Sequence, residues 1–379
     1  MVEAAADTTV DDFKEVVLKT LFEDEFTRRV TVVDLLLGEK RLESASTLAD
    51  SGVSSEAEVL AVFSTRLVEC SWKQESPYDL RVENRAVCLT IPARSTIRSS
   101  AFYGCTSIQR LTIPDSVTAI GSSAFFDCRA LRGVTMSDSV LRIGEGAFAG
   151  CDALTSVTLP RFITTIEKST FRNCKSLKAV EIPKLVTSIE EEAFLFCSSL
   201  ESLEIPDSVT SIGPAAFRRC SRLRTLLLPS SVTAIGDWAF DACSSMTSLT
   251  LPSQLLSIRT GAFRGCGLLS LTIPGSVTRL ERAAFRSCCA LVTLELPPSL
   301  VSIGAEAFAA CRQLQSLTLP CSVTSIEADA FRGCLALTHL KILGSEATVA
   351  PGAFRDCPLE TLEASWTVRN QIRQACAIA

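Results

Sequence analysis

The stretch AFRRCSRLRTLLLPSSVTAIGDW, residues 216–238, contains the unit that decides the fold. Its Phe217 recurs along the chain every 23 residues, with one step of 22, and a Cys follows each of these phenylalanines by three residues. All but one of the phenylalanines follow an Ala. Twelve copies with two fixed columns identify an internal repeat, which indicates a stacked, elongated fold rather than separate globular domains. The repeated phenylalanines are Phe102, Phe125, Phe148, Phe171, Phe194, Phe217, Phe240, Phe263, Phe285, Phe308, Phe331 and Phe354.

The columns of the repeat predict its local structure. In residues 111–114, Leu-Thr-Ile-Pro, apolar and polar side chains alternate, as in a strand with one buried face. The Pro removes a backbone donor and so ends the strand. Val117 and Ile120 are expected to point back inward, and Ala-Phe to begin a short helical turn with the Phe in the interior. Each repeat, or rung, is therefore predicted to add one short strand to a parallel sheet.

A single rung buries too little apolar surface to offset the entropy of ordering its own residues. Rungs must stack to become stable, and the stack needs caps at both ends. The repeat decays near residue 365. Residues 366–379 place Val368, Ile372, Cys376 and Ile378 on an amphipathic pattern, which predicts a capping helix.

The A-F-x-x-C-x-x-L and I-P-x-S-V-T-x-I-G patterns resemble those of the BspA-like leucine-rich repeats, over about residues 85–365. The resemblance implies an α/β leucine-rich-repeat solenoid of about 12 rungs of 23 residues. It also implies a curved sheet whose concave face binds partners. Because many members of that family are cell-surface proteins proposed to adhere to partners, a cell-surface adhesin is an alternative function.

Residues 1–64 lack the repeat and resemble a partial ubiquitin-like β-grasp domain. The resemblance rests on residues 34–53, with their Lys-x-Leu-Glu and Thr-Leu-x-Asp steps, and on the final apolar segment 58–63. Residues 9–21 carry one apolar stripe, which predicts the single long helix of that fold. The first strand of the family is missing, since Met1 aligns near the second. Residues 65–84 are expected to form a linker or N-terminal cap.

Two residues of this segment, Leu36 and Val62, fall where ubiquitin carries parts of its apolar partner-binding patch. They are equally compatible with core or edge positions. No Gly-Gly follows Phe63, so the segment is not expected to act as a conjugated tag. An adaptor of the ubiquitin–proteasome system is therefore an alternative function.

Composition excludes several classes of function. The formal net charge of −5 gives no concentrated basic character for nucleic-acid binding. The N-terminus lacks the basic region and apolar core of a secretory signal, and no apolar run has the length needed to cross a membrane. These features favour a cytoplasmic protein with no membrane insertion.

The sequence contains no catalytic signature. His339 is the single histidine, and it is interpreted as a solvated strand residue. No C-x-x-C pair, phosphate-binding loop or nucleophile motif occurs. The Cys of each rung is expected to pack inside as a small apolar group rather than in a disulfide. The sequence therefore predicts no catalytic residue, no metal site, no cofactor and no enzymatic activity.

The outward column of the predicted strands is the favoured binding site, for a protein partner. Thr is also a good strand former, so a purely structural role is the alternative. Ice binding is disfavoured because Glu, Leu and Lys interrupt the Thr row. An Arg column after the Phe is expected to be neutralised by neighbouring acids. The outward column is Thr112, Thr135, Thr158, Glu181, Glu204, Leu227, Thr250, Thr272, Glu295, Thr318 and Lys341.

Overall fold

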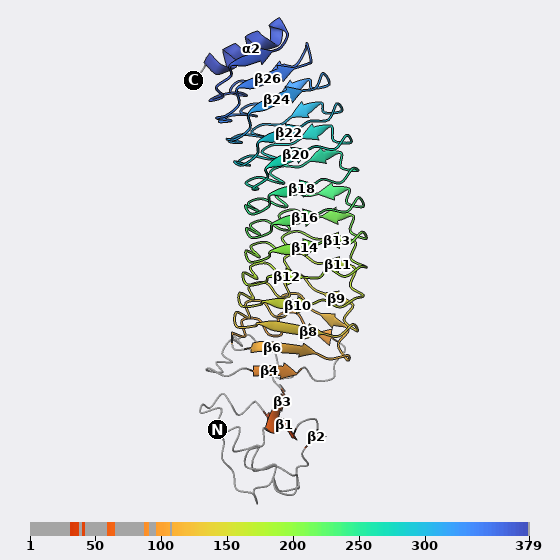
Figure 1. Cartoon of the computed structure of the whole chain (residues 1–379). Helices are drawn as coiled ribbons and strands as arrows, with labels where there is room; N and C mark the ends of the chain where they lie inside the picture. Colours follow the sequence, from red (N-terminus) through yellow and green to blue (C-terminus); the bar gives the residue numbers. More distant parts are fainter. Residues whose placement is uncertain are drawn as a thin grey trace, which may run out of the picture.

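The computed structural model describes residues 96–377 apart from residue 107, and the backbone of four further strands within residues 31–90. Its repeats form an elongated parallel β-solenoid of about twelve turns (Figure 1). One strand from each rung lies in a row of parallel strands, here called the main sheet, which is hydrogen-bonded as three successive ladders. Its strands are β4 (Val87–Thr90), β6 (Ile108–Ile113), β8 (Gly133–Met136), β10 (Ser156–Thr158), β12 (Ala179–Val180), β14 (Ser202–Glu204), β16 (Thr225–Leu227), β18 (Ser248–Thr250), β20 (Ser270–Thr272), β22 (Thr293–Glu295), β24 (Ser316–Leu319), β26 (His339–Ile342) and β28 (Thr361–Glu363).

The strand register follows the period of the sequence. Thr112 pairs with Thr135, and Thr135 pairs with Thr158, each a step of 23 residues. The single short repeat is accommodated as a step of 22, in which Ser257 pairs with Arg279. Equivalent side chains of successive rungs therefore lie directly above one another, at the spacing of neighbouring strands, about 4.8 Å.

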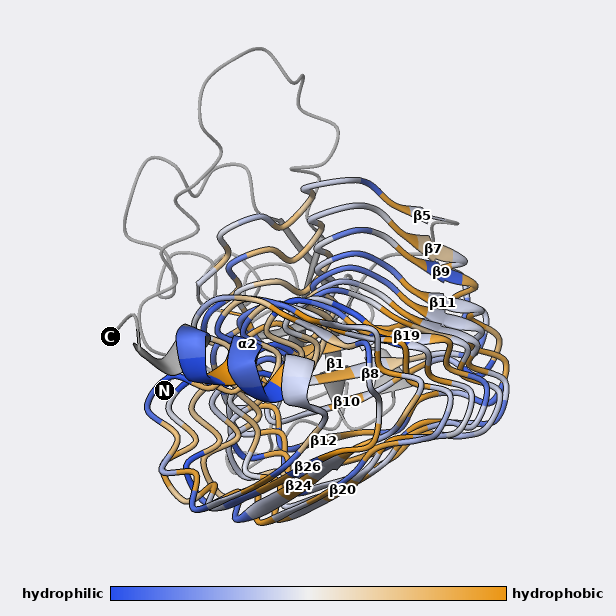
Figure 2. Ribbon diagram, turned by 90° about the horizontal axis from the view of Figure 1, so that it is seen from above, coloured by the Kyte–Doolittle hydropathy of each residue, from blue (hydrophilic) through white to orange (hydrophobic). Residues whose placement is uncertain are grey.

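Each rung also contributes a second, two-residue strand, where the sequence predicts only one strand per rung. The second strand ends on the buried Ile120 or its equivalent and pairs in parallel with the second strand of a neighbouring rung, in three successive ladders. Seen along the solenoid, this second ladder lies beside the main sheet (Figure 2). Its strands are β5 (Thr96–Ile97), β7 (Ala119–Ile120), β9 (Arg142–Ile143), β11 (Thr165–Ile166), β13 (Ser188–Ile189), β15 (Ser211–Ile212), β17 (Ala234–Ile235), β19 (Ser257–Ile258), β21 (Arg279–Leu280), β23 (Ser302–Ile303), β25 (Ser325–Ile326) and β27 (Thr348–Val349).

The Ala-Phe segments are linked turns, and the predicted short helical turns do not form. Around Phe148, every second amide bonds three residues back, as from Ala149 to Gly146. The intervening amides donate instead to the next rung, as from Phe148 to the Thr170 carbonyl at 3.0 Å. Hydrogen bonds between rungs thus replace the bonds that a helix would make within one rung. The residues two before and two after each Phe adopt positive φ, as at Gly146 and Gly150.

Positive φ is costly for residues with a Cβ, and the turns therefore offer a matched pair of substitutions. Gly333 (φ 71°) and Ala310 (φ 59°) occupy the same position in adjacent rungs, and a Cβ on Gly333 would meet no atom closer than 3.9 Å. We expect Gly333→Ala to lower the free energy of unfolding by about 1 kcal/mol. Ala310→Gly should raise it by a smaller amount, because the flexible unfolded chain opposes the gain. Urea unfolding of both variants measures the signs, and a loss for Ala310→Gly would contradict this account.

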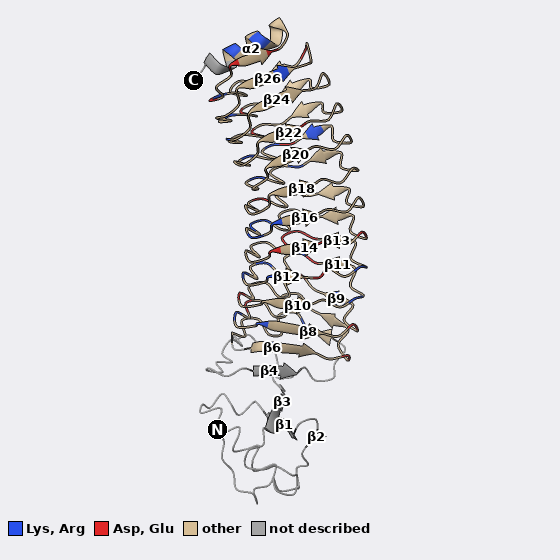
Figure 3. Cartoon of the chain, in the orientation of Figure 1, with Lys and Arg blue, Asp and Glu red and all other residues tan. Residues whose placement is uncertain are grey.

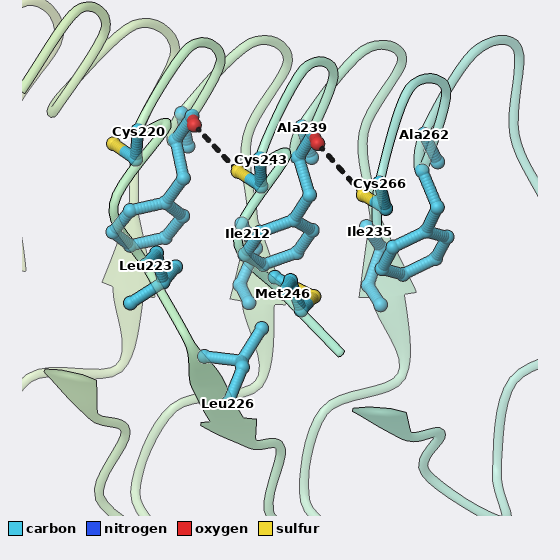
Figure 4. Packing of buried hydrophobic residues seen from close by; sticks show 14 of the residues in the cluster. Ile212, Cys220, Leu223, Leu226, Ile235, Ala239, Cys243, Met246, Ala262 and Cys266 are labelled. Carbon is cyan, nitrogen blue, oxygen red and sulfur yellow. Dashed lines mark hydrogen bonds between the residues drawn. The ribbon is translucent and has the colours of Figure 1, made fainter. Parts of the chain in front are cut away.

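The interior is a continuous stack of phenyl rings. From Phe102 to Phe354, the ring centroids of adjacent rungs are 5.1–5.8 Å apart and nearly parallel. Beside the rings, each buried thiol donates a hydrogen bond to the Phe carbonyl of the preceding rung. Cys243 Sγ lies 3.3 Å from the Phe217 oxygen, and Cys266 repeats this bond one rung later (Figure 4). The thiols are thus packed inside as predicted and also serve as donors.

The C-terminal end of the solenoid is covered by the helix α2 (Trp366–Ala377), in the segment where a capping helix is expected. Ser365 begins the helix by accepting the Val368 amide on its hydroxyl. Val368 and Ile372 are buried beneath it. The Gln371 side-chain oxygen accepts a hydrogen bond from the Val349 amide of β27 at 2.8 Å. It thus replaces the acceptor that a further rung would have offered to this strand.

Within residues 1–64, three antiparallel strands are described: β1 (Thr31–Leu37), β2 (Lys40–Arg41) and β3 (Val59–Ser64), in the order β2-β1-β3. The predicted helix at 9–21 lies outside the described residues. A ubiquitin-like fold for residues 1–64 stays a prediction.

Candidate protein-binding face

The predicted outward column forms one aligned row on the main sheet, and each of its eleven members is exposed. Glu204, Leu227 and Thr250 pair in successive strands, as do Thr272 with Glu295 and Thr318 with Lys341. The apolar residue on either side of each position faces the interior. Eleven residues far apart in the sequence therefore share one continuous face.

A second outward row lies two residues before the first, and sequence analysis overlooked it. The period of two in the strands was the signal that could have found it. Its side chains are small over most of the solenoid, so they leave the face smooth and the first row fully accessible. This row contains Gly133, Ser156, Ala179, Ser202, Thr225, Ser248, Ser270, Thr293 and Ser316.

Threonine hydroxyls on the main sheet and threonine hydroxyls beside the second ladder differ in whether they form hydrogen bonds within the solenoid. Next to the second ladder, Thr187, Thr210 and Thr233 each donate to the carbonyl 23 residues earlier, at 3.2–3.3 Å. On the main sheet, the hydroxyls of Thr135 and Thr158, like those of Thr250 and Thr318, make no hydrogen bond within the part of the chain that the structure describes. The former stabilise the stack, whereas the latter remain available to a partner.

Charge on the main sheet is concentrated toward its middle and its C-terminal end. Glu181 and Glu204 are neighbours in the row and form no ion pair with any described residue. Near the end, Lys341 Nζ lies 2.7 Å from Glu363, and this contact lowers the pKa of the Glu363 carboxyl. Leu227 follows Glu204 and is 73% exposed, which makes it the most exposed large apolar residue of the row.

Five of the six arginines of the column on the turns pair with acids of adjacent rungs, whereas Arg355 forms no ion pair with a described residue. Arg172 pairs with Glu192 at 2.7 Å. Arg218 and Arg264 share the buried carboxylate of Asp241, at 2.9 and 3.8 Å, and both guanidinium groups lie over the Trp238 ring. Figure 3 shows basic and acidic residues interspersed along the turns. This side therefore presents no free basic stripe.

The described groups with chemical reactivity are dispersed along the solenoid, and most of the thiols are buried. His339 is exposed in β26 and its Nδ1 contacts the Thr338 hydroxyl at 2.8 Å. Burial raises the pKa of Cys105 to about 11 and of Cys288 to about 12, so these thiols stay protonated at neutral pH. The described residues contain no group of His, Cys, Asp and Glu suited to a metal ion. None of the described helices has the length and apolarity to cross a membrane.

For Leu36 and Val62, the candidate residues of the N-terminal segment, the structure describes only the pairing of their strands. Leu36 lies opposite Leu60 in the pairing of β1 with β3, and Val62 lies opposite Asp34. Both are thus on neighbouring strands, and their proposed apolar patch stays a prediction.

Stacked 23-residue rungs with a parallel main sheet define a leucine-rich-repeat protein. The sequence model of the "BspA type Leucine rich repeat region (6 copies)" matches residues 95–224, 164–292 and 257–376. The chain belongs to this family.

Solved structures show the same repeat architecture. A leucine-rich repeat protein from Bacteroides ovatus is 25% identical, with a TM-score of 0.56 over 70% of this chain and 81% of that one. The pneumococcal vaccine antigen PcpA is 20% identical, with a TM-score of 0.53 over 76% and 81%, and shows the fold alone. A leucine rich cell surface protein from Faecalibacterium prausnitzii is 29% identical over 77% and 91%, with a TM-score of 0.48. A comparison with curated proteins finds no match.

Proposed function

We propose that this chain is a non-enzymatic scaffold that binds a protein partner on its main sheet. The observation that carries the proposal is the row of exposed side chains, most of whose hydroxyl and carboxylate groups bond to no described residue. Within the row, Thr272 donates to Glu295 at 3.1 Å. About twelve rungs at roughly 4.8 Å give a face nearly 60 Å long. That length accommodates the roughly 800 Å² that each partner buries in a standard interface.

The centre of the proposed interface is the segment from Glu181 through Glu204 to Leu227. Most of the energy of a protein interface comes from a few central residues around which water is excluded. Leu227 offers apolar area to bury, and the two unpaired carboxylates beside it select a partner with donors or positive charge. Small residues of the second row, Ser202 and Thr225, allow the partner to approach closely.

We expect the triple variant E181K/E204K/L227D to lose at least about tenfold in affinity for its protein partners. Its free energy of unfolding should change little, since all three side chains are exposed. The measurement is co-precipitation with quantitative mass spectrometry from the native cell extract. A matched variant with the same kinds of substitution away from the main sheet, E145K/L256D/E346K, should retain the partners. Equal recovery by both variants would remove the basis of the proposal.

The N-terminal segment supports a second function, an adaptor of the ubiquitin–proteasome system. The antiparallel β1–β3 pairing around Leu36 favours it. Binding of the full chain to purified proteasomal ubiquitin receptors, weakened by Leu36→Ala, would support this role, and equal binding would count against it. A cytoplasmic location belongs to the same proposal, whereas surface labelling of intact cells would favour an adhesin.

A further inference from the structure

A row of serines stabilises the edge between the main sheet and the second ladder. In the pattern P-x-S-V-T, the Ser hydroxyl donates to a buried carbonyl of the preceding rung. Ser208 Oγ, for example, lies 2.6 Å from the Val186 oxygen, and Ser231 repeats the bond to Val209 at 2.7 Å. The same bond is made by Ser139, Ser276, Ser299 and Ser322.

Two adjacent rungs replace this serine by a large apolar residue, Phe162 and Leu185. Their side chains are 53% and 50% exposed. The carbonyls that would receive the hydroxyls belong to Val140 and Ile163, which are buried, and no described residue donates to them. Both substitutions therefore cost a hydrogen bond and leave apolar surface in water. Neither side chain is part of the buried core.

A third large apolar residue adjoins this pair. Leu141, in the rung before Phe162, is 58% exposed in a column that is otherwise mostly threonine. Leu141, Phe162 and Leu185 thus come from three successive rungs and lie on the same edge of the solenoid. Apolar residues scattered singly on a surface need no explanation, but three in consecutive rungs form a patch.

Basic side chains border the patch. Arg161 donates through Nε to Asp138 at 2.7 Å, and Arg142 lies 3.3 Å from Glu167, yet both guanidinium groups remain largely exposed. Each retains further N–H donors for another acceptor. Lys184 has no carboxylate within ion-pair distance in the described part of the chain. Figure 3 shows basic residues near β9 and β11.

We propose that these six residues, here named the edge patch, dock a segment of a partner protein that presents apolar side chains next to carboxylates. Burial of Phe162, Leu141 and Leu185 provides the apolar contact, and Arg142, Arg161 and Lys184 pair with the acidic groups. This site is separate from the main sheet, so the scaffold would hold two partners at once. With Asp138 and Glu167, the three cations leave a net charge of +1 (3 − 2), which suits a segment with few carboxylates among apolar side chains rather than an anionic membrane surface.

The test uses the full chain and arrays of short peptides in which Leu and Phe alternate with Asp and Glu. Matched peptides carry Lys in place of the acids. We expect the acidic peptides alone to be retained, and peptides chosen from the array to bind about tenfold more weakly to F162S/L185S in fluorescence anisotropy. The variant restores the serines of the repeat, so it should unfold at no lower urea concentration than the wild type. The variant L256T/V301T, which removes exposed apolar residues of distant rungs, should bind as the wild type does.

Several results would overturn the edge patch as a protein-docking site. These are equal retention of acidic and basic peptides, retention of neither, or unchanged affinity in F162S/L185S. Binding of phosphatidylserine vesicles that F162S/L185S abolishes would assign the patch to membranes instead. Dimers in light scattering that F162S/L185S dissociates would assign it to self-association. The substitutions E181K/E204K/L227D should not alter peptide binding here, so failure of the main-sheet proposal and failure of this one are distinguishable.

Discussion

Raising the pH above about 9 is expected to unfold the solenoid cooperatively. Burial raises the pKa of the thiol in ten successive rungs, from Cys105 to Cys311, above the ordinary value of about 9. In the eleventh rung, a hydrogen bond with Cys357 and then burial raise the pKa of the Cys334 thiol. In the folded state these thiols keep their protons, whereas in the unfolded chain they ionise as the pH passes 9. Far-UV circular dichroism and urea unfolding between pH 7 and 11 measure the effect.

The sign follows from proton linkage. Below the unfolded pKa, both states bind the same protons and the thiols impose no dependence on pH. Above it, the unfolded state has lost protons that the folded state retains, so stability falls by about 1.4 kcal/mol per pH unit for each thiol. Eleven thiols together can exceed the roughly 5–15 kcal/mol stability of a typical domain within about one pH unit. The loss continues until the pH reaches the folded pKa values.

Ionisation of Lys and Tyr also begins in this range, so single substitutions isolate the thiols. In Cys220→Ala, the unfolding free energy should fall less steeply as the pH rises above 9. The slope should be smaller by the contribution of one thiol, about 1.4 kcal/mol per pH unit. Leu227→Ala, at an exposed residue that does not titrate, should leave that dependence unchanged. Reductant throughout excludes disulfide formation. A native circular dichroism spectrum at pH 11 would contradict the assigned role of the buried thiols.

Removing one ring from the interior stack is expected to have the next largest effect. Phe217 is fully buried between Phe194 and Phe240, at ring distances of 5.2 and 5.3 Å. Phe217→Ala leaves a cavity that the rigid rungs on both sides cannot fill, which costs about 3–5 kcal/mol. Urea unfolding followed by circular dichroism measures this loss.

The control is Leu227→Ala in the same rung, an exposed position where a change within about 0.5 kcal/mol is expected. Because each rung contacts its neighbours alone, the Phe217→Ala variant could also separate the unfolding of the two halves of the solenoid into two transitions. A loss below about 1 kcal/mol without a second transition would mean that the stack relaxes around the missing ring.

The rigid interior has a consequence for binding. Equivalent residues on the main sheet are held at a fixed spacing by three sets of contacts between rungs: the main sheet, the second ladder and the turns. Binding of a partner that matches this spacing carries a small entropic cost, because the face is already ordered before the partner binds. The exposed row from Thr112 to Lys341 therefore behaves as one extended surface rather than as eleven independent side chains.

The sequence by itself determined the stack, its period, and which columns face inward. Phe217 and Cys220 repeat at a spacing that only stacked rungs can bury, and the alternation around Leu227 assigned that residue to the outer face. These patterns can be recognised because buried positions require apolar side chains, and the repeat shows the same requirement in twelve copies. The eleven outward residues could be named for the same reason.

Only the tertiary structure decided how the rungs hydrogen-bond to one another. A two-residue strand such as β15 is too short to leave a periodic pattern, so the second ladder was not predicted. The turns around Phe148 do not become helical because their amides find carbonyls in the next rung. Likewise, whether a threonine stabilises the stack, as Thr210 does, or stays free, as Thr158 does, depends on a carbonyl 23 residues away. Sequence specifies the residue at each position, but these bonds exist only once the rungs are stacked.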